Sequence, residues 1–331
     1  MSRLGICIAG CNGAVASTVV AGAALLRRGL TEPLALISEP YRLTGFDEMI
    51  FAGWDPRGET LLAAARRNRV LDEARLAPVA KELAQLKPWK PKSPARDLDR
   101  FRRQHKLDTV VVLNLLPTGE NAASQAYALA AAKTGCPFIN FTPNDCGEEK
   151  LAEIPFCGRD GKTGQTWFKS VLAPALRARG LRVTGWFSTN LLGNEDGKIV
   201  GDPEKGKQKI RDKSRLLGEM LGYEPFHQVQ INYYPPRGDN KESWDNIDFD
   251  GFLGLPMQIK VNALYRDSIL AAPMCLDLCR FMELAYRRGE RGVQEWLSYY
   301  FKSPYARNTK APPLHDAAVQ ERMLRDYLAR G

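Results

Sequence analysis

Three absences narrow what this chain can be. None of its seven cysteines forms a Cys-x-x-Cys pair, and Cys275 and Cys279 are spaced to share one helix face. This pattern favours buried thiols in a reducing compartment over a disulfide framework. The longest apolar stretch near the N-terminus, Val19 to Leu26, is too short to cross a bilayer and ends in two arginines. Since no cleavable signal pattern is visible either, we expect a cytoplasmic protein that does not associate with membranes.

Metal motifs and nucleic-acid recognition modules are also missing. The three histidines, His105, His227 and His315, have no ligand-like spacing, so we predict structural roles for them and no metal site. A net charge of +9 would suit a nucleic acid, but the basic excess lies in scattered arginines and in a loop-like segment from Lys87 to Arg103. We expect no nucleic-acid partner. We expect the positive charge to bind an anionic small molecule. The alternative is that it belongs only to a solvated surface.

What is present is an alternation of strands and helices over 331 residues, enough for two domains. Strand candidates lie at residues 4–9, 48–55, 109–118 and 137–143, and helix candidates at about 16–28, 61–86 and 121–134. This alternation predicts an α/β fold with a doubly wound parallel sheet. From Trp186 onward the pattern changes. Residues 228–234 and 249–264 are typical of antiparallel strands, and helices are expected to continue to Tyr300.

The first strand leads into a turn that suits a dinucleotide. It contains Gly10, Cys11, Asn12, Gly13, Ala14 and Val15, and a helix follows. Ile8 stands where Gly-x-Gly-x-x-Gly would have its first glycine, so a tight turn without a ligand is about equally compatible with these residues. Asn114 and Thr118, at the exit of the strand from Thr109, would lie at the same sheet edge.

Asp55 ends the second strand and is our candidate for binding the adenosine ribose. A carboxylate there favours NAD over NADP because it repels a 2′-phosphate. Asp55 lies further along than the usual ~20 residues, so residues 30–47 must be an insertion. Glu39 is the competing candidate.

The stretch from Gly158 to Lys213 contains three further features. A glycine-spaced loop, Gly158 to Thr166, opens onto an amphipathic run, which suits a phosphate. A short apolar strand then ends in a polar turn, Ser188 to Gly197. Four lysines follow, at positions 205, 207, 209 and 213. Lys209 and Lys213 share a helix face, whereas Lys205 and Lys207 fit a solvated surface. Together these features suggest chemistry on an anionic sugar.

With these motifs in order, the chain resembles the 1L-myo-inositol 1-phosphate synthase family from end to end. The matching segments are GWD at 53–55, GCPFIN at 135–140, KTGQT at 162–166, KSVLAPAL at 169–176, STNLLGNEDG at 188–197, KIRDKS at 209–214, GDNK at 238–241, RDSILAAP at 266–273 and FKSP at 301–304. The chain departs from the family pattern at Leu191 and Glu195, at the nucleotide turn and in the loop after Asn140. These differences concern the substrate more than the reaction class.

The resemblance implies an isomerase that uses NAD without net oxidation, in inositol and phospholipid biosynthesis. Glucose 6-phosphate would be oxidised at carbon 5, and the resulting ketone would acidify carbon 6. The enolate would then attack the aldehyde at carbon 1, and the ketone would be reduced again. Alkoxide and enolate charges need fixed cations in a dry site, and lysine can supply both the charge and a proton.

The resemblance also implies roles for individual residues. Lys209 would shuttle the proton of the carbon 5 hydroxyl, helped by Asp160, while Lys241 and Lys302 would stabilise oxyanions. Phosphate would be held by Lys213 with Thr163, Gly164, Gln165 and Thr166. The sugar hydroxyls and the lysines would be contacted by Asn190, Leu192, Asn194, Asp196, Asp239 and Asp267. Asp267 would in addition lie near the cofactor, unless it serves only as a helix N-cap.

We therefore expect an NAD-binding Rossmann-like domain, residues 1–185 plus 303–331, and an inserted α+β catalytic and oligomerisation domain, residues 186–302. The resemblance implies a homotetramer, or otherwise a dimer. Three alternatives remain open: a carbocyclase acting on another sugar phosphate such as fructose 6-phosphate, a plain NAD-dependent dehydrogenase, and a catalytically inactive binding protein. The four lysines argue against the last.

Overall fold

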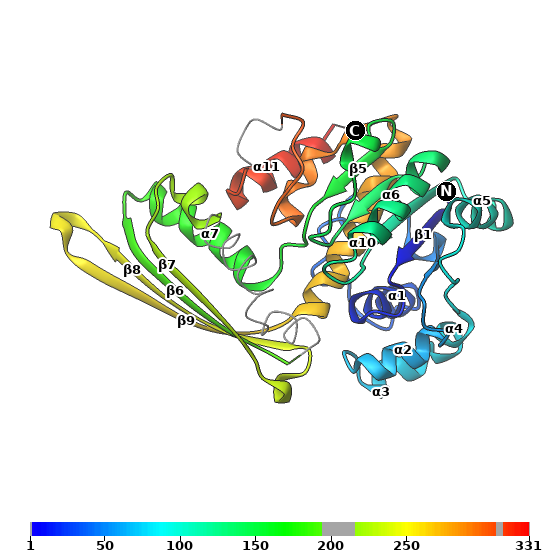
Figure 1. Ribbon diagram of the computed structural model, residues 1–331, viewed down its shortest axis with the longest axis horizontal. Coiled ribbons are helices and arrows are strands. Elements are labelled where there is room, and N and C mark those ends of the chain that lie inside the picture. The colour runs from blue at the N-terminus through cyan, green and yellow to red at the C-terminus, as the bar shows by residue number, and fades with distance from the viewer. Residues whose placement is uncertain (1, 194–215, 309–313, 331) are drawn as a thin grey trace. The chain divides into compact units, whose positions relative to one another are not determined.

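The computed structural model describes residues 2–193, 216–308 and 314–330, and the chain divides into two compact units (Figure 1). Unit 1 comprises Met1–Gly161, Ala271–Pro313 and Leu328–Gly331. Unit 2 comprises Lys162–Leu270 and Leu314–Tyr327. No helix in the described ranges is long and apolar enough to cross a membrane.

Unit 1 contains a parallel sheet in the strand order β10-β5-β4-β3-β1-β2. Its strands are β1 (Leu4–Ala9), β2 (Met49–Trp54), β3 (Thr109–Asn114), β4 (Phe138–Asn140), β5 (Pro155–Gly158) and β10 (Gly292–Val293). Every residue of β1 and β3 is buried, so the centre of the sheet is covered on both faces. The strand order reverses between β1 and β3, and ligands of doubly wound sheets bind at such a reversal.

The helices of unit 1 are α1 (Ala14–Arg27), α2 (Leu61–Asn68), α3 (Glu73–Leu76), α4 (Ala80–Gln85), α5 (Pro94–His105), α6 (Asn121–Thr134) and α10 (Asp267–Arg287), whose first residues belong to unit 2. Helices α2 and α4 pack against α1, whereas α5 and α6 pack on the sheet. On one face, Phe101 of α5 and Tyr127 and Ala131 of α6 pack with Cys7 and Val112 of the strands. This core fixes the strand ends that form the nucleotide turn.

Unit 2 contains a four-stranded mixed sheet in the order β7-β6-β8-β9. Its elements are α7 (Gly164–Ala178), β6 (Arg182–Leu192), β7 (Phe226–Tyr233), β8 (Asn240–Asp250), β9 (Pro256–Arg266) and α11 (Ala317–Leu328). One apolar core joins α7 to the sheet, with Ala173 and Leu176 of the helix packed against Trp186, Ile247 and Phe249. Helix and sheet therefore form one body.

One face of this sheet changes from apolar to polar along its length. Trp186 pairs with Ile247 in the apolar part, whereas Ser188 pairs with Asp245. Further along, Leu192, Lys241 and Tyr265 lie side by side on β6, β8 and β9. Since alternate residues of a strand share a face, the buried apolar residues and these polar ones belong to the same side.

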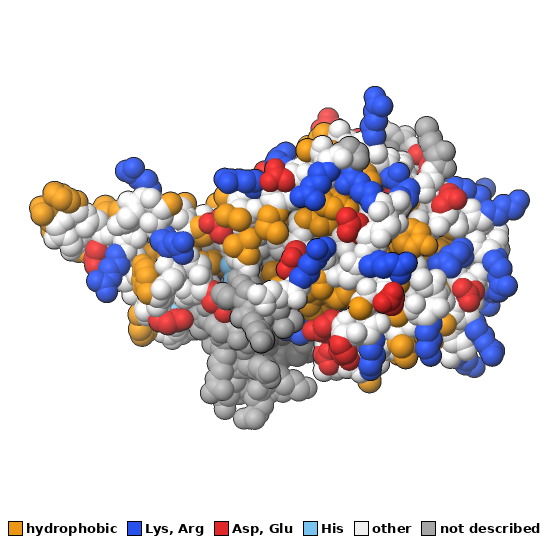
Figure 2. Space-filling model, turned by 90° about the horizontal axis from the view of Figure 1, so that it is seen from above, with side chains coloured by type: hydrophobic (Ala, Val, Ile, Leu, Met, Phe, Trp, Pro, Cys, Tyr) orange, Lys and Arg blue, Asp and Glu red, His pale blue; other side chains and the backbone are white. Residues whose placement is uncertain are grey.

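The predicted α/β class is confirmed. The strand at residues 4–9 and the helix at 121–134 have the predicted positions. The strand predicted at 109–118 begins at Thr109 but ends at Asn114. All seven cysteines are free and buried. On the face drawn in Figure 2, basic side chains are interspersed with acidic ones.

Several local predictions are wrong. Strand β7 runs parallel to β6, and residues 249–264 are not one strand, because a turn at 251–255 joins β8 to β9. Residues 188–192 continue β6 instead of forming a turn. The segment from Lys87 to Arg103 is a loop only in its first half, since α5 begins at Pro94.

Two longer predicted helices also differ in the structure. The region 61–86 is divided into α2, α3 and α4, and α10 ends at Arg287 instead of continuing to Tyr300, because β10 and a 3-10 helix at Glu295–Tyr300 follow. The compact units likewise differ from the predicted boundaries. The first boundary lies at residue 161 and not at 185, because α7 shares its apolar core with β6.

Candidate active site

The glycine turn of unit 1 is shaped for close backbone approach. Gly10 has a positive φ of 83°, and a Cβ there would lie 2.8 Å from the carbonyl oxygen of Leu115 in the loop after β3. The amides of Gly10 and Cys11 both donate to the carbonyl of Trp54 at the end of β2. The turn is thereby held against the exits of both neighbouring strands.

Helix α1 begins directly after this turn with open amide groups. Gly13 flanks the helix, no side chain caps it, and its first turn contains no acidic residue. The N–H groups of the first turn have no partners within the helix, and the helix dipole favours negative charge there. The predicted cofactor residues Ala14 and Val15 therefore offer backbone donors suited to a pyrophosphate, whereas the Gly13 amide donates to the Gly10 carbonyl within the turn.

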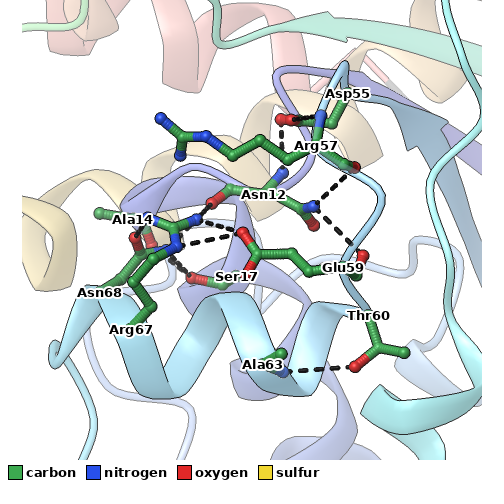
Figure 3. A network of polar contacts seen from close by, with 10 residues as sticks. All are labelled: Asn12, Ala14, Ser17, Asp55, Arg57, Glu59, Thr60, Ala63, Arg67 and Asn68. Atoms are coloured by element: carbon green, nitrogen blue, oxygen red, sulfur yellow. Dashed lines mark hydrogen bonds and ion pairs between the residues drawn. The ribbon is translucent and has the colours of Figure 1, made fainter.

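Asp55 lies at the end of β2 and holds the turn in place (Figure 3). Its Oδ2 accepts the amide of Asn12 at 3.0 Å and its Oδ1 accepts the amide of Arg57 at 2.9 Å. The Asn12 side chain donates in turn to the carbonyls of Arg57 and Glu59. Asp55 is buried, so its carboxylate organises the turn that would carry the cofactor.

Helix α2 closes the same network from the other side (Figure 3). Arg67 and Asn68 both donate to the carbonyl of Asn12, at 3.0 and 3.1 Å, and Asn68 also donates to Ser17 Oγ. Arg67 is paired with Glu59. The backbone of Asn12 is therefore fixed at both its amide and its carbonyl.

Asn114 and Thr118, the other predicted cofactor residues, lie at the end of β3 and in the loop after it. The Asn114 side chain is buried and donates to Ser124 Oγ and Asn140 Oδ1, while its own oxygen accepts the amide of Leu116. Its hydrogen bonds hold the loop that contains Thr118. Cofactor contacts by these two side chains stay a prediction.

Asp160 and Lys302 meet within unit 1. Residues 159–161 follow β5 and pair with the segment at Phe301, and the Lys302 Nζ lies 3.0 Å from Asp160 Oδ1. Both side chains are partly exposed, and the Lys302 amide also donates to the Asp160 carbonyl at 2.7 Å. Asp160 has a positive φ of 64°, which is uncommon outside glycine. The predicted pair is thus an ion pair on two joined loops.

The predicted loop, Gly158 to Thr166, is divided in the structure, because Gly158–Gly161 belong to unit 1 and α7 of unit 2 already begins at Gly164. Thr163 flanks the helix without capping it, and the helix begins at Gly164, whose φ is 53°. A Cβ on Gly164 would lie 3.5 Å from the Tyr265 ring and 3.8 Å from Asp267 Oδ1. Gln165 and Thr166 are buried. Open amides at this helix end suit an anion.

Lys241, Asp239 and Asp267 gather beside this helix end. Lys241 Nζ lies 3.9 Å from Asp267 Oδ2, and Ser268 Oγ donates to Asp239 Oδ1 at 2.8 Å. Burial raises the pKa of Asp239, and the nearby Asp267 adds to this effect. Asp239 Oδ2 and Asp267 Oδ1 are buried and have no hydrogen-bond partner among the described residues. Helix α10 begins at Asp267 itself, an acidic residue in the first turn.

A second polar cluster lies under the first turn of α7. Gln165 Nε2 donates to Asp245 at 2.8 Å, and Gln165 Oε1 accepts from Asn190 at 2.9 Å. Asp245 also accepts from the indole of Trp186 and from Ser188 Oγ, both at 2.7 Å. The Gln165 side chain is thereby held inward, so its contribution to an anion site would come from its backbone.

Sequence reasoning missed Asp245 and two buried lysines. Burial lowers the pKa of Lys162 to about 7 and that of Lys169 to about 8. Lys162 Nζ donates to Gln320 of α11 at 2.5 Å, and Lys169 Nζ lies 2.8 Å from His227 Nε2. The alternation of Ser243, Asp245 and Ile247 could have indicated a strand with a polar buried face.

The structure therefore groups some predicted residues and leaves others undecided. Gly164, Lys241, Asp239 and Asp267 lie together in unit 2, with Leu192 buried on the neighbouring strand. Asn194, Asp196, Lys209 and Lys213 lie outside the described residues. Within the described part of the chain, no cluster of three histidine, cysteine or acidic side chains could hold a metal ion.

The chain is similar to known proteins over nearly its whole length. The family described as myo-inositol-1-phosphate synthase matches residues 164–268. Inositol-3-phosphate synthase 1 of Bacteroides thetaiotaomicron is 35% identical, over 98% of this chain and 95% of that protein.

Two crystal structures share the fold over nearly the whole chain. The inositol-3-phosphate synthase of Caenorhabditis elegans has a TM-score of 0.87 at 20% identity, covering 99% of this chain and 85% of the other. A myo-inositol-1-phosphate synthase-related protein of Thermotoga maritima has a TM-score of 0.81 at 22% identity, covering 98% of both chains. With an identity of 35% extending over nearly the full length of a curated relative, the chain belongs to the inositol-3-phosphate synthase family.

Proposed function

We propose that the protein converts glucose 6-phosphate to 1L-myo-inositol 1-phosphate, with NAD as a cofactor that is regenerated in each cycle. The observation that carries this proposal is the grouping of Lys241, Asp239 and Asp267 beside the open amide end of α7. An anionic sugar needs these two elements together, a phosphate cradle and a cation next to hydroxyl-binding carboxylates. Membership of the family adds the expected reaction class.

The residues of unit 1 fit a dinucleotide. The open first turn of α1 suits the pyrophosphate, and Gly10 leaves no room for a side chain beside Leu115. Asn12 Oδ1 is buried and has no partner among the described residues, so it is available to a donor on the cofactor. Asp55 would bind the ribose through the remaining lone pairs of its carboxylate. When bound, NAD would supply the temporary oxidation of one sugar hydroxyl.

The chain's own groups would then handle charge and protons. The Lys241 side chain is only 14% exposed, so its positive charge acts in a poorly hydrated place and can stabilise a developing oxyanion. Asp267 holds that ammonium within ion-pair distance. In unit 1, Asp160 orients the Lys302 ammonium in the same manner. We assign Lys209 to proton transfer at the carbon 5 hydroxyl and Lys213 to the phosphate on the family resemblance.

We also propose that the chain assembles as a homotetramer. Phe226, Trp244 and Leu264 of the unit 2 sheet are exposed, as are Phe252 and Leu253 in the turn between β8 and β9. Hydrophobic side chains gather at the end of this sheet, on the left of Figure 2. Exposed apolar area of this kind favours association with another protein surface. Sedimentation analysis of wild type and Leu264→Asp tests this, since the variant should yield smaller species.

The test of function is an incubation of purified protein with NAD and glucose 6-phosphate, followed by phosphorus NMR and by NADH absorbance. An inositol phosphate signal without net NADH supports the proposal. A cyclitol formed from fructose 6-phosphate but not from glucose 6-phosphate would replace it with the carbocyclase. Steady accumulation of NADH would replace it with a plain dehydrogenase.

A further inference from the structure

The polar cluster beneath α7 has a fixed hydrogen-bond polarity. Asp245 is buried, and an ionised carboxylate can only accept hydrogen bonds. Its Oδ1 accepts from Trp186 and Ser188, and its Oδ2 accepts from Gln165. The indole of Trp186 is a donor only, so this end of the cluster cannot be reversed.

The acceptor role of Asp245 fixes the orientation of two side-chain amides, those of Gln165 and Asn190. Because Asp245 accepts, the nitrogen of the Gln165 amide must face it, and the oxygen of Gln165 must face Asn190. Asn190 must then turn its own nitrogen toward Gln165. Its remaining acceptor, Oδ1, is buried and has no partner among the described residues. Amide orientations in proteins are set by such networks.

We propose that Asp245 is a positioning residue that makes Asn190 present an acceptor, so that Asn190 recognises a sugar hydroxyl and not a phosphate oxygen. This inference rests on the proposed function, because it assigns a sugar phosphate to the site. A hydroxyl can donate to Asn190 Oδ1, whereas a phosphate oxygen accepts and would face another acceptor. The phosphate is left to the open amides of α7.

A buried lysine, Lys169, lies beside this cluster. Lys169 lies over the Trp186 ring, with its Nζ 5.5 Å from the ring centre, and Trp186 donates to Asp245 from the same ring system. Asp245 also moderates the lowering of the Lys169 pKa. The cation, the ring and the carboxylate thus stabilise one another in a buried setting.

Asp245→Asn tests this chain of hydrogen bonds, from Asp245 through Gln165 to Asn190, with almost no change in side-chain volume. The new amide nitrogen would donate to Gln165, whose amide would turn over, and Asn190 would then present its nitrogen. We expect the affinity for glucose 6-phosphate, measured by calorimetry, to fall by about tenfold to a hundredfold. The affinity for inorganic phosphate should stay within about twofold. Asp248→Asn, on the opposite face of β8, is the matched control and should change neither affinity.

A second substitution should reverse the loss. With Asp245 intact, Asn190→Asp places two acceptors face to face and should also weaken glucose 6-phosphate binding. When Asp245→Asn and Asn190→Asp are combined, the turned Gln165 donates to the new carboxylate at position 190, which again presents an acceptor. We expect the double variant to bind at least about tenfold more tightly than Asp245→Asn. The proposal would be overturned if Asp245→Asn and the double variant lost the same affinity for glucose 6-phosphate. It would also be overturned if the affinity for inorganic phosphate fell together with that for glucose 6-phosphate, since this would indicate misfolding of the site.

A measurement on the wild type covers the case in which Asp245→Asn does not fold. Deoxy analogues of glucose 6-phosphate first identify the hydroxyl whose removal weakens binding to wild type but not to Asn190→Ala. The analogue with fluorine in place of that hydroxyl is then compared with the deoxy analogue. Because fluorine accepts but cannot donate, the fluoro analogue should bind as weakly as the deoxy analogue. Retained affinity for the fluoro analogue would overturn the proposal. Wild type that binds inorganic phosphate but no glucose 6-phosphate would instead reject the proposed function, and with it this role of Asn190.

Discussion

Within the part of the chain that the structure describes, the two units differ in which polar groups they leave without a hydrogen-bond partner. Around the glycine turn of unit 1, Asp55 and Asn114 use their hydrogen bonds to hold neighbouring loops, and the groups left open are mostly backbone amides. In unit 2, by contrast, Asp239, Asp267 and Asn190 each keep a buried oxygen without a partner in the described ranges. Unit 1 thus offers mainly backbone groups, whereas unit 2 adds several side-chain oxygens, unpartnered among the described residues, to the open amides of α7.

This difference has a physical cost that falls on unit 2. An unpaired buried polar group costs about 1–3 kcal/mol, so three such oxygens would destabilise a surface that had no ligand to meet. Satisfied hydrogen bonds rigidify a loop, as at the backbone amide and carbonyl of Asn12, whereas buried oxygens without a partner are typical of sites completed by another molecule. Binding energy in unit 1 should therefore depend on backbone shape, and in unit 2 on individual functional groups.

Removal of Lys241 should give the largest effect. We expect Lys241→Ala to reduce kcat by about 10³-fold or more, because the developing oxyanion loses a poorly hydrated cation. The melting temperature should change little, since the ion pair of Lys241 with Asp267 is long, at 3.9 Å. Lys260→Ala, an exposed lysine on β9 of the same sheet, is the control and should retain full activity. Comparable loss in both variants would contradict a specific role.

Gly10→Ala tests the backbone half of the comparison. The added Cβ would lie 2.8 Å from the Leu115 carbonyl at a backbone φ of 83°, so the turn must shift. We expect NADH affinity, measured by fluorescence titration, to fall about a hundredfold and the melting temperature to drop. The affinity of unit 2 for inorganic phosphate should not change. Gly22→Ala in α1 meets no atom within 4 Å and should stabilise the protein by about 0.5–1 kcal/mol.

Asp55→Asn should have a smaller effect on the same turn. The variant keeps one acceptor oxygen, but its amide nitrogen would face the N–H of Asn12 or of Arg57. We expect about tenfold weaker NADH binding and a smaller preference for NADH over NADPH, because the charge that repels a 2′-phosphate is gone. Asp99→Asn, on the exposed side of α5, serves as the control. An unchanged preference would mean that Asp55 only holds the turn.

Unit 1 was the easier half to predict from sequence, for a reason visible in its residues. Strands β1 and β3 are buried on both faces and appear as continuous apolar runs, and α6 is an alanine-rich run ended by Gly135. Helix α5 was missed because only Leu98 and Phe101 of its twelve residues are buried, and the rest are largely charged. Two apolar residues three positions apart are a weak signal.

Unit 2 resisted prediction because its buried face is polar. Strand β8 carries Ser243 and Asp245 inward, so its alternation is hidden in a hydrophilic sequence. Lys162 and Lys169 are buried although lysines are usually exposed, and only tertiary contacts with α11 and β7 show where they lie. The direction of β7 depends on pairing across the sheet, which no local pattern contains.

The smallest effect concerns the buried lysines of unit 2 and is read from stability against pH. The pKa of Lys162 is about 7 in the folded protein, lowered by burial from its ordinary value of 10.5. Between these values the unfolded chain binds a proton that the folded chain does not, so stability should rise as pH increases from about 7 toward 10.5 and stay level below 7. Lys162→Met should remove the slope between pH 7 and 8 and reduce it above pH 8, where Lys169, whose pKa is about 8, still contributes. Lys133→Met, at an exposed lysine of α6 in unit 1, should keep the full slope. Melting temperatures of the three proteins at pH 7, 8 and 9 measure the difference. If the melting temperatures of all three proteins change equally with pH, Lys162 stays protonated in the folded protein, and its surroundings contain more water than its contacts indicate.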